Sequence, residues 1–226
     1  MKWLYKLEYK YGRRYIRRLM LIVVIGMVVV YLADVFGASA GMSPLPSTYL
    51  MLSRDAILHG QVWRLITFVF VPPGGNAFLL LISLYFYYIM GNMLETYWGG
   101  FRLNIYYLFG IVGTWLAMFI VGYGTNSYLN LSLFLAFATI APDTTFRLFF
   151  IIPIKAKWMA LAYAALMAIQ LIITFITAPL AGLYSLVSLA FSLLNYFLFF
   201  GRTLIDEIRN QMRIAQNKRN WRNRNR

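Results

Sequence analysis

The stretch NSYLNLSLFLAFATIAP, residues 126–142, decides how this chain folds. It is apolar enough to enter a bilayer, yet its first half carries four polar side chains, Asn126, Ser127, Asn130 and Ser132. As a helix it would span only about 24 Å, against a hydrocarbon core of about 30 Å. We therefore expect a short fourth helix in the middle of a helical bundle, where neighbouring helices satisfy its amides and hydroxyls.

The composition around this stretch is that of a polytopic membrane protein. Hydrophobic residues make up 61% of the chain and charged residues only 12%, although the net charge is +14. Apolar runs of this length exclude a soluble domain. The positive charge lies beside the apolar runs, where basic residues set membrane topology, so no nucleic-acid partner is expected. The chain has no cysteine, which excludes disulfides and thiolate chemistry.

Working outward toward the N-terminus, the sequence predicts three segments. Residues 1–18 interleave basic and aromatic side chains, as in a cytoplasmic amphipathic segment that lies on anionic lipid. A first membrane span is expected at residues 19–35, retained rather than cleaved as a signal peptide. Residues 37–77 are rich in Gly, Pro and Ser and should form an outer interfacial loop with short helices.

The remaining spans follow from the apolar runs. We expect them at residues 78–94, 103–123, 126–142, 158–177 and 179–200, with a cytoplasmic loop at 144–157 and a basic cytoplasmic tail at 202–226. With six spans and both termini inside, cytoplasmic segments hold 19 of the 21 Lys and Arg residues. The positive-inside rule therefore predicts an all-α bundle of six transmembrane helices, residues 19–201, with cytoplasmic ends.

Several motifs, taken in order, resemble the rhomboid family. The segment GQVWRLITFVF contains Trp63 and Arg64, and is similar to the Trp-Arg segment in the first loop of rhomboids. The segment GNMLETYWGGFRLNIY resembles the pattern between rhomboid spans two and three and supplies Glu95, Gly99 and Arg102. Pro142 and FFIIPIKAKW look like the end of span four and the loop beyond it. The resemblance runs from about residue 18 to residue 202 and implies a rhomboid-like bundle.

The same resemblance shows which catalytic groups are missing. Ser127 falls where the rhomboid nucleophile would be, but the family's Gly-x-Ser-Gly reads Thr-Asn-Ser-Tyr here. Ser185 falls where the general-base histidine belongs, and Leu79 and Ser83 occupy the positions of the His and Asn that would stabilise the oxyanion. The resemblance thus implies a pseudoprotease without the Ser-His dyad, with these four residues as vestigial positions.

Elementary chemistry leads to the same expectation. A serine hydroxyl needs a neighbouring base to act as a nucleophile near neutral pH. The only histidine, His59, falls in the outer loop rather than on a span. The lysines of the 144–157 loop are expected at the cytoplasmic face, away from Ser127. No metal-ligand spacing is present and no cofactor is expected.

We assign the conspicuous residues structural or contact roles. Trp63, Arg64, Glu95, Gly99, Arg102 and Pro142 form the structural motif, with Glu95 and Arg102 as a polar set at the membrane edge. Small residues at Ala181, Ser185, Ser188 and Ser192 recur at helical spacing, which predicts close packing against the fourth span. Contact with clients or lipid is expected from Asn126, Tyr128 and Gln170.

Three functions of different classes remain open. The favoured hypothesis is a non-catalytic protein that binds transmembrane segments of other proteins or perturbs lipid. Derlins, a related non-proteolytic branch, act in that way during the extraction of membrane proteins. The second is a serine intramembrane protease with Ser127 as nucleophile, and the third is a small-molecule transporter, which would call for inverted repeats. The absence of cysteine and the basic ends favour a bacterial plasma membrane.

Overall fold

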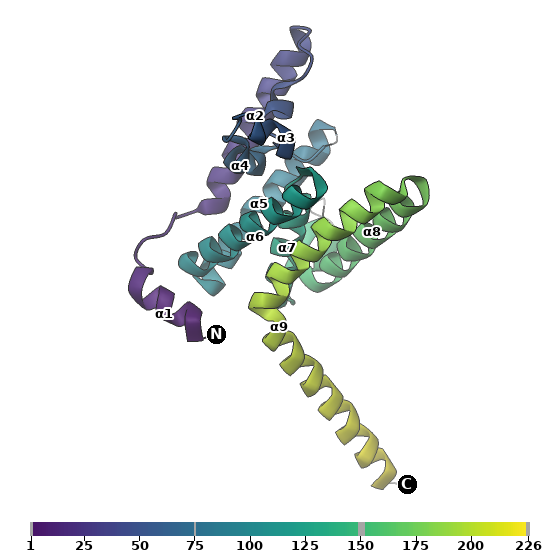
Figure 1. Ribbon diagram of the computed structural model, residues 1–226. Coiled ribbons are helices and arrows are strands. Elements are labelled where there is room, and N and C mark those ends of the chain that lie inside the picture. The colour runs from purple at the N-terminus through teal and green to yellow at the C-terminus, as the bar shows by residue number, and fades with distance from the viewer. Residues whose placement is uncertain (1, 75, 149–151, 225–226) are drawn as a thin grey trace.

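Five long apolar helices and one short one form a bundle (Figure 1). The computed structural model describes residues 2–74, 76–148 and 152–224. Within them, the helices long and apolar enough to cross a membrane are α2 (Leu19–Ser39), α5 (Ala77–Trp98), α6 (Gly100–Val121), α8 (Ala156–Thr177) and the first part of α9 (Pro179–Arg224). An all-α membrane protein fits this arrangement.

Helix α7 (Ser127–Ile140) is the short helix at the centre. Its 14 residues rise about 21 Å, and it contacts α5, α6, α8 and α9. Buried residues occur on every side of it, whereas α8 has only Ala156 and Ala160 buried. A helix that is buried all round belongs to the interior. The central position expected for this stretch is therefore observed.

Glycine, proline and asparagine set the helix ends. The Asn76 side chain accepts a hydrogen bond from the Leu79 amide at 2.9 Å and caps the start of α5. Gly99 has a φ of 94°, which suits glycine, and separates α5 from α6. Gly122, with a φ of 98°, ends α6, and Pro179 begins α9. Apart from the end of α9, the observed helix boundaries lie within a few residues of those expected.

The loop between α2 and α5 contains the expected short helices. These are η1 (Pro46–Tyr49), α3 (Arg54–Leu58), α4 (Arg64–Thr67) and η2 (Phe68–Phe70). A two-residue strand, β1 (Leu52–Ser53), pairs antiparallel with β2 (Tyr123–Gly124). This pairing fastens the loop to the junction between α6 and α7, because Leu52 lies opposite Gly124 and Ser53 opposite Tyr123.

Two expectations need correction. The segment 144–157 is more than a loop, because β3 (Thr145–Leu148) and β4 (Ile152–Lys155) pair as an antiparallel hairpin. Its strands hold Thr, Phe and Ile, which favour extended backbone. Part of the expected FFIIPIKAKW motif, residues 149–151, lies outside the described residues. The last helix was also expected to end at about residue 200, but α9 continues through the basic tail to Arg224.

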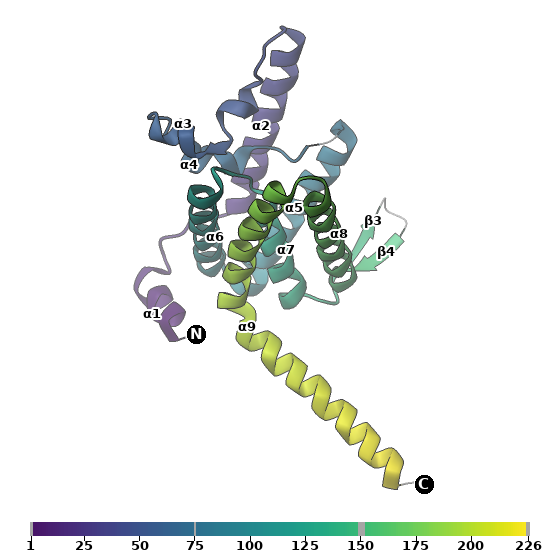
Figure 2. The ribbon, with the colours of Figure 1, turned by 45° about the vertical axis from the view of Figure 1, so that its right-hand side comes forward.

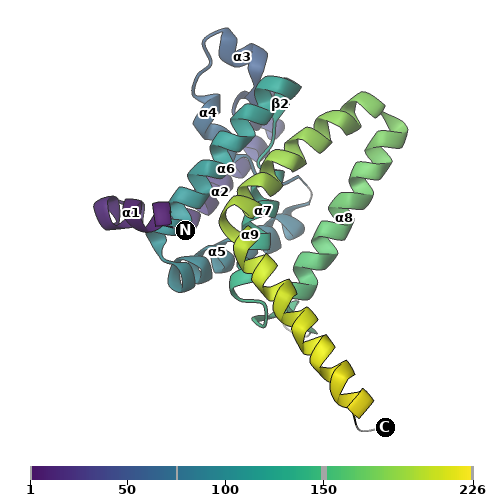
Figure 3. The same ribbon diagram turned by 60° about the horizontal axis from the view of Figure 1, so that its bottom comes forward.

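The two ends of the chain lie toward the same end of the bundle (Figure 2). Helix α1 (Lys2–Tyr11) and the distal part of α9 point away from α3, which lies at the opposite end. Figure 3 shows the distal part of α9 projecting clear of the other helices.

Candidate functional site

A membrane groove between α5, α7 and α8

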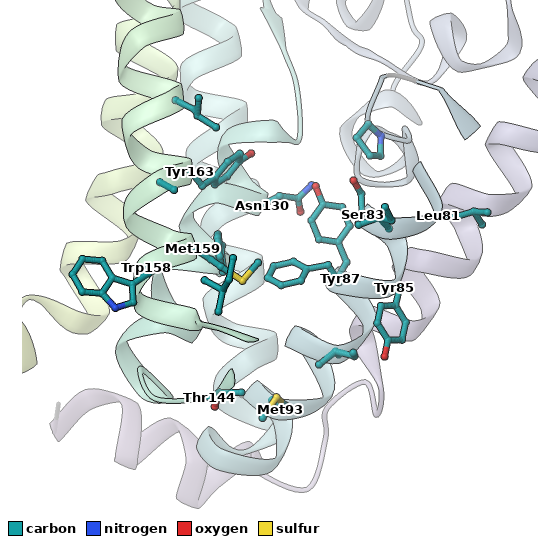
Figure 4. Close-up of a pocket in the computed structure, with 18 of the residues that line it drawn as sticks. Leu81, Ser83, Tyr85, Tyr87, Met93, Asn130, Thr144, Trp158, Met159 and Tyr163 are labelled. Carbon is teal, nitrogen blue, oxygen red and sulfur yellow. The ribbon is translucent and has the colours of Figure 1, made fainter. Parts of the chain in front are cut away.

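A groove of about 1340 Å³ lies between α5 and α8. Helix α7 forms its back wall, and Thr145 and Ile154 of the hairpin lie at one end. Figure 4 shows the lining side chains. Most are apolar or aromatic, and none of the described lining residues is Asp, Glu, Lys, Arg or His. The groove is therefore suited to an uncharged, largely apolar occupant.

Aromatic contacts hold the three walls together. The Phe86 ring of α5 meets the Phe134 ring of α7 edge-on, with 5.0 Å between centroids. Phe134 also lies 5.9 Å from the Tyr163 ring of α8. Phe134 is buried and thus joins both side walls to the central helix.

Polar side chains from all three helices meet inside the groove. The side chains of Asn130 and Tyr87 are hydrogen-bonded to each other, and Tyr163 of α8 lies in the same part of the groove (Figure 4). Ser83 lies one turn before Tyr87 on α5, and its hydroxyl donates to the Leu79 carbonyl at 2.9 Å. Asn130 is only 3% exposed, and its Oδ1 has no hydrogen-bond partner in the described structure.

Positions of the predicted residues

The four vestigial positions do not form a hydrogen-bonded catalytic set within the described residues. Ser127 is the first residue of α7 and is exposed, and Ser185 is half-buried on α9. Leu79 is 51% exposed, while Ser83 faces the groove and bonds to its own helix. His59 is exposed, with Nδ1 2.6 Å from the carbonyl oxygen of Asp55.

Asn126 does not fit the expected contact with clients or lipid. It is 6% exposed, and its amide donates to the carbonyl oxygens of Val71 at 2.8 Å and Val69 at 3.3 Å. Its role is therefore to join α7 to the end of the outer loop. Tyr128 is half-buried, and its carbonyl accepts a hydrogen bond from the Ser192 hydroxyl. Gln170 is exposed on α8.

The structural motif divides between the two ends of the bundle. In the outer loop, Trp63 Nε1 donates to the Tyr49 carbonyl at 3.2 Å. Arg64 is 7% exposed, and its guanidinium donates to Gln61 Oε1 at 2.7 Å and to the carbonyls of Thr48 and Met51 at 2.8 and 2.7 Å. A buried cation is satisfied here by neutral oxygens.

At the other end, Glu95 and Arg102 do not pair with each other. Glu95 accepts hydrogen bonds from the backbone amide of Arg18, the nearer oxygen at 3.0 Å. Arg102 Nη2 binds Glu8 at 2.8 Å. Both residues thus hold the N-terminal segment. The Pro142 carbonyl accepts a hydrogen bond from the Lys157 amide at 3.3 Å and closes the base of the hairpin.

Sequence reasoning missed a second polar cluster, which lies between α6, α7 and α9. The Tyr106 hydroxyl donates to the Ser132 carbonyl at 2.8 Å and also contacts the Ser132 hydroxyl. Asn195 Nδ2 lies 3.4 Å from both Tyr106 O and Ser132 Oγ. Polar residues inside apolar spans were the available signal. The groove residues Tyr87 and Tyr163 were missed as well. For Tyr87 a signal was available, because Ser83 and Tyr87 lie one helical turn apart and therefore share a face of α5.

Comparison with known proteins

Residues 17–128 match a protein-family model described as "Eukaryotic integral membrane protein (DUF1751)". The match spans α2, the outer loop, α5, α6 and the start of α7, just under half of the chain. No curated protein sequence matches the chain. The match and the apolar helices agree that this is an integral membrane protein. Because the description concerns eukaryotic proteins, the expectation of a bacterial plasma membrane has no support.

Proposed function

We propose that this integral membrane protein is a rhomboid-like pseudoprotease that holds the transmembrane segment of a client protein in the groove between α5 and α8. The observation that carries the proposal is the groove itself. Its described lining is uncharged, and it runs along helix α5. The rhomboid-like motifs in the sequence support this proposal.

The dimensions of the groove fit a helix better than a compact ligand. Its lining runs from Phe78 to Met93 on α5, a rise of about 22 Å, against a hydrocarbon core of about 30 Å. Dividing the volume by this length gives a mean cross-section of about 60 Å². An α-helix about 10 Å across occupies roughly 80 Å². A client helix would therefore sit mostly within the groove and keep one side toward lipid.

The surroundings of Ser127 support a non-catalytic role. Nucleophilic serines depend on a base within hydrogen-bonding distance. In the part of the chain that the structure describes, Ser127 hydrogen-bonds neither His59 nor Ser185, and the His59 ring lies against the carbonyl of its own short helix. The alternative of a serine protease would need a base from a partner.

We also propose six membrane crossings with both termini in the cytoplasm. Helix α1 and the distal part of α9 lie at the same end of the bundle (Figure 2). This supports an even number of crossings, with α7 as the short one. The distribution of Lys and Arg supports a cytoplasmic location of that end.

Client binding has more support than general thinning of the bilayer. Helix α7 is short enough for hydrophobic mismatch, but α5, α6, α8 and α9 surround it. Helix α7 could therefore contact lipid only through the groove, and its short length would affect the bilayer only there.

Photo-crosslinking with a defined client tests the proposal. The full-length protein, carrying a photoreactive residue at Ile89 or Met159 in the groove, would be placed in lipid nanodiscs with a single-pass Leu-Ala helix peptide. The control position is Val29, which is 60% exposed on α2. We expect peptide adducts from the two groove positions only. Lipid adducts alone, or equal capture from Val29, would overturn client binding in the groove.

A fluorophosphonate probe tests the non-catalytic part separately. We expect wild-type protein and Ser127→Ala to remain equally unlabelled. Labelling that Ser127→Ala abolishes would contradict the pseudoprotease assignment and restore the protease alternative.

A further inference from the structure

One polar atom of the groove lining has no hydrogen-bond partner among the described residues. Asn130 Oδ1 is buried and accepts no hydrogen bond within the described structure, although the side chain hydrogen-bonds Tyr87. Leaving a buried acceptor unpaired costs free energy, so native proteins usually satisfy such groups. Asn130 lines the groove, and a turn of its side chain would bring the buried Oδ1 to an occupant.

The polar site lies near the middle of helix α5. Tyr87 is the eleventh of the 22 residues of α5, and Figure 4 shows Asn130 between Tyr87 and Tyr163. Apolar side chains line the groove on both sides along its length, from Phe78 at one end to Met93 at the other. A transmembrane helix seated there would present its central residues to Asn130.

The chemistry of the site selects a neutral donor. A charged client residue would find no opposite charge among the lining residues, and burying it unpaired would be costly. A hydroxyl or amide side chain can donate to Oδ1 and accept in return from a tyrosine hydroxyl.

We propose that the groove prefers client helices that carry Ser, Thr, Asn or Gln near mid-membrane, and that Asn130 recognises this side chain by accepting a hydrogen bond from it. This inference rests on the proposed function, since it takes the groove as the client site. It adds a rule for which clients are held. A helix with an exposed polar side chain in the bilayer is poorly suited to remain alone in lipid.

The test uses three single-pass Leu-Ala peptides of equal length. The first has Asn at its centre, the second has Leu there, and the third has Asn moved two turns toward one end. Binding to full-length protein in nanodiscs would be measured by fluorescence energy transfer. For wild type we expect the centre-Asn peptide to bind about 3- to 15-fold more tightly than the other two, the range of hydrogen bonds between membrane helices.

Two matched variants assign the effect to Asn130. Asn130→Leu should bind all three peptides equally. Asn195→Leu also removes a buried asparagine whose Oδ1 is unpartnered, but Asn195 does not line the groove, so the preference for centre-Asn should remain. Thermal melting provides a further readout. Asn130→Leu removes the unpaired acceptor together with the hydrogen bond to Tyr87, and because these two changes oppose each other the variant should unfold close to wild type.

The outcomes separate the inference from the function on which it rests. Equal binding of centre-Asn and centre-Leu peptides to wild type would overturn the preference while client binding stands. Loss of the preference in Asn195→Leu, or early unfolding of Asn130→Leu, would assign Asn130 a structural role and overturn the inference. Absence of binding by every peptide would overturn the proposed function itself.

Discussion

Arg102 and Glu8 form an ion pair that fastens helix α1 to helix α6. Arg102 Nη2 lies 2.8 Å from Glu8 Oε2, and Nε lies 3.0 Å from the same oxygen. The guanidinium also lies over the Tyr5 ring at 4.9 Å. Through this pair, Arg102 fixes the basic N-terminal segment along the bundle rather than completing a site between the spans.

Replacing Glu8 should release α1 without unfolding the bundle. The two side chains are 25% and 31% exposed, so Glu8→Gln should lower the free energy of unfolding by less than about 1 kcal/mol. Helix α1 should become more accessible, and trypsin should cleave faster at Lys6 and Lys10 in nanodisc samples. The control is Asp55→Asn, whose side chain is 77% exposed. Unchanged cleavage in Glu8→Gln would show that the ion pair does not hold α1.

Much of the fold follows from length and polarity along the chain. The 126–142 stretch is too short and too polar for lipid, which is why its central position as α7 could be predicted. The small-residue seam on the last span could be predicted for a similar reason, and Ser192 is indeed buried against α7. Such features are local properties of one segment, so the sequence displays them directly.

The groove could not be predicted because its walls come from distant segments. Tyr87, Asn130 and Tyr163 are each unremarkable in sequence and acquire a shared role only when α5, α7 and α8 meet. The direction of Asn126 was misjudged because sequence does not say which face of a helix meets the outer loop. The hairpin at 145–155 was missed because its strands are four residues each, too short for a clear alternation.

Removing the Arg64 guanidinium should loosen the outer loop. It supplies donors to two backbone carbonyls and the Gln61 side chain while almost fully buried. Arg64→Met would leave these acceptors unpaired and should lower the free energy of unfolding by about 2 to 4 kcal/mol. Denaturant titration in detergent micelles measures the change.

Arg54 gives the matched control for that substitution. Its side chain is 42% exposed, and its hydrogen bonds to Asp55 and to the Phe119 carbonyl are both 3.4 Å long. Arg54→Met should change the free energy of unfolding by less than about 0.5 kcal/mol. If the two variants were equally stable, burial of Arg64 would carry no energetic weight.

Close packing of α2 on α5 depends on Gly91. A Cβ built on Gly91 would lie 2.2 Å from Met20 Cβ, an atom that cannot move without the backbone. Gly91→Ala should therefore separate the helices and lower the free energy of unfolding by about 1 to 3 kcal/mol. Gly113→Ala on α6 is the control, because the nearest atom would be 3.6 Å away. It should leave stability unchanged or raise it by up to about 1 kcal/mol, and equal losses in both variants would contradict the packing argument.

The base of the hairpin should respond to acid through Asp143. Lys155 Nζ donates to Asp143 Oδ1 at 3.0 Å and Lys157 Nζ at 3.4 Å, and these hydrogen bonds lower the pKa of the Asp143 carboxyl below its ordinary 3.8. A group with a lowered folded-state pKa contributes stability that is present above its unfolded pKa and lost as the pH falls through its folded pKa. The hairpin contacts should thus be intact near neutral pH and weaken only below about pH 4. Carboxyl-labelled NMR titration of Asp143 in nanodiscs measures this pKa, and the double variant Lys155→Met, Lys157→Met should return it toward 3.8. A wild-type pKa at or above 3.8 would mean that the lysines do not hold the carboxylate in solution.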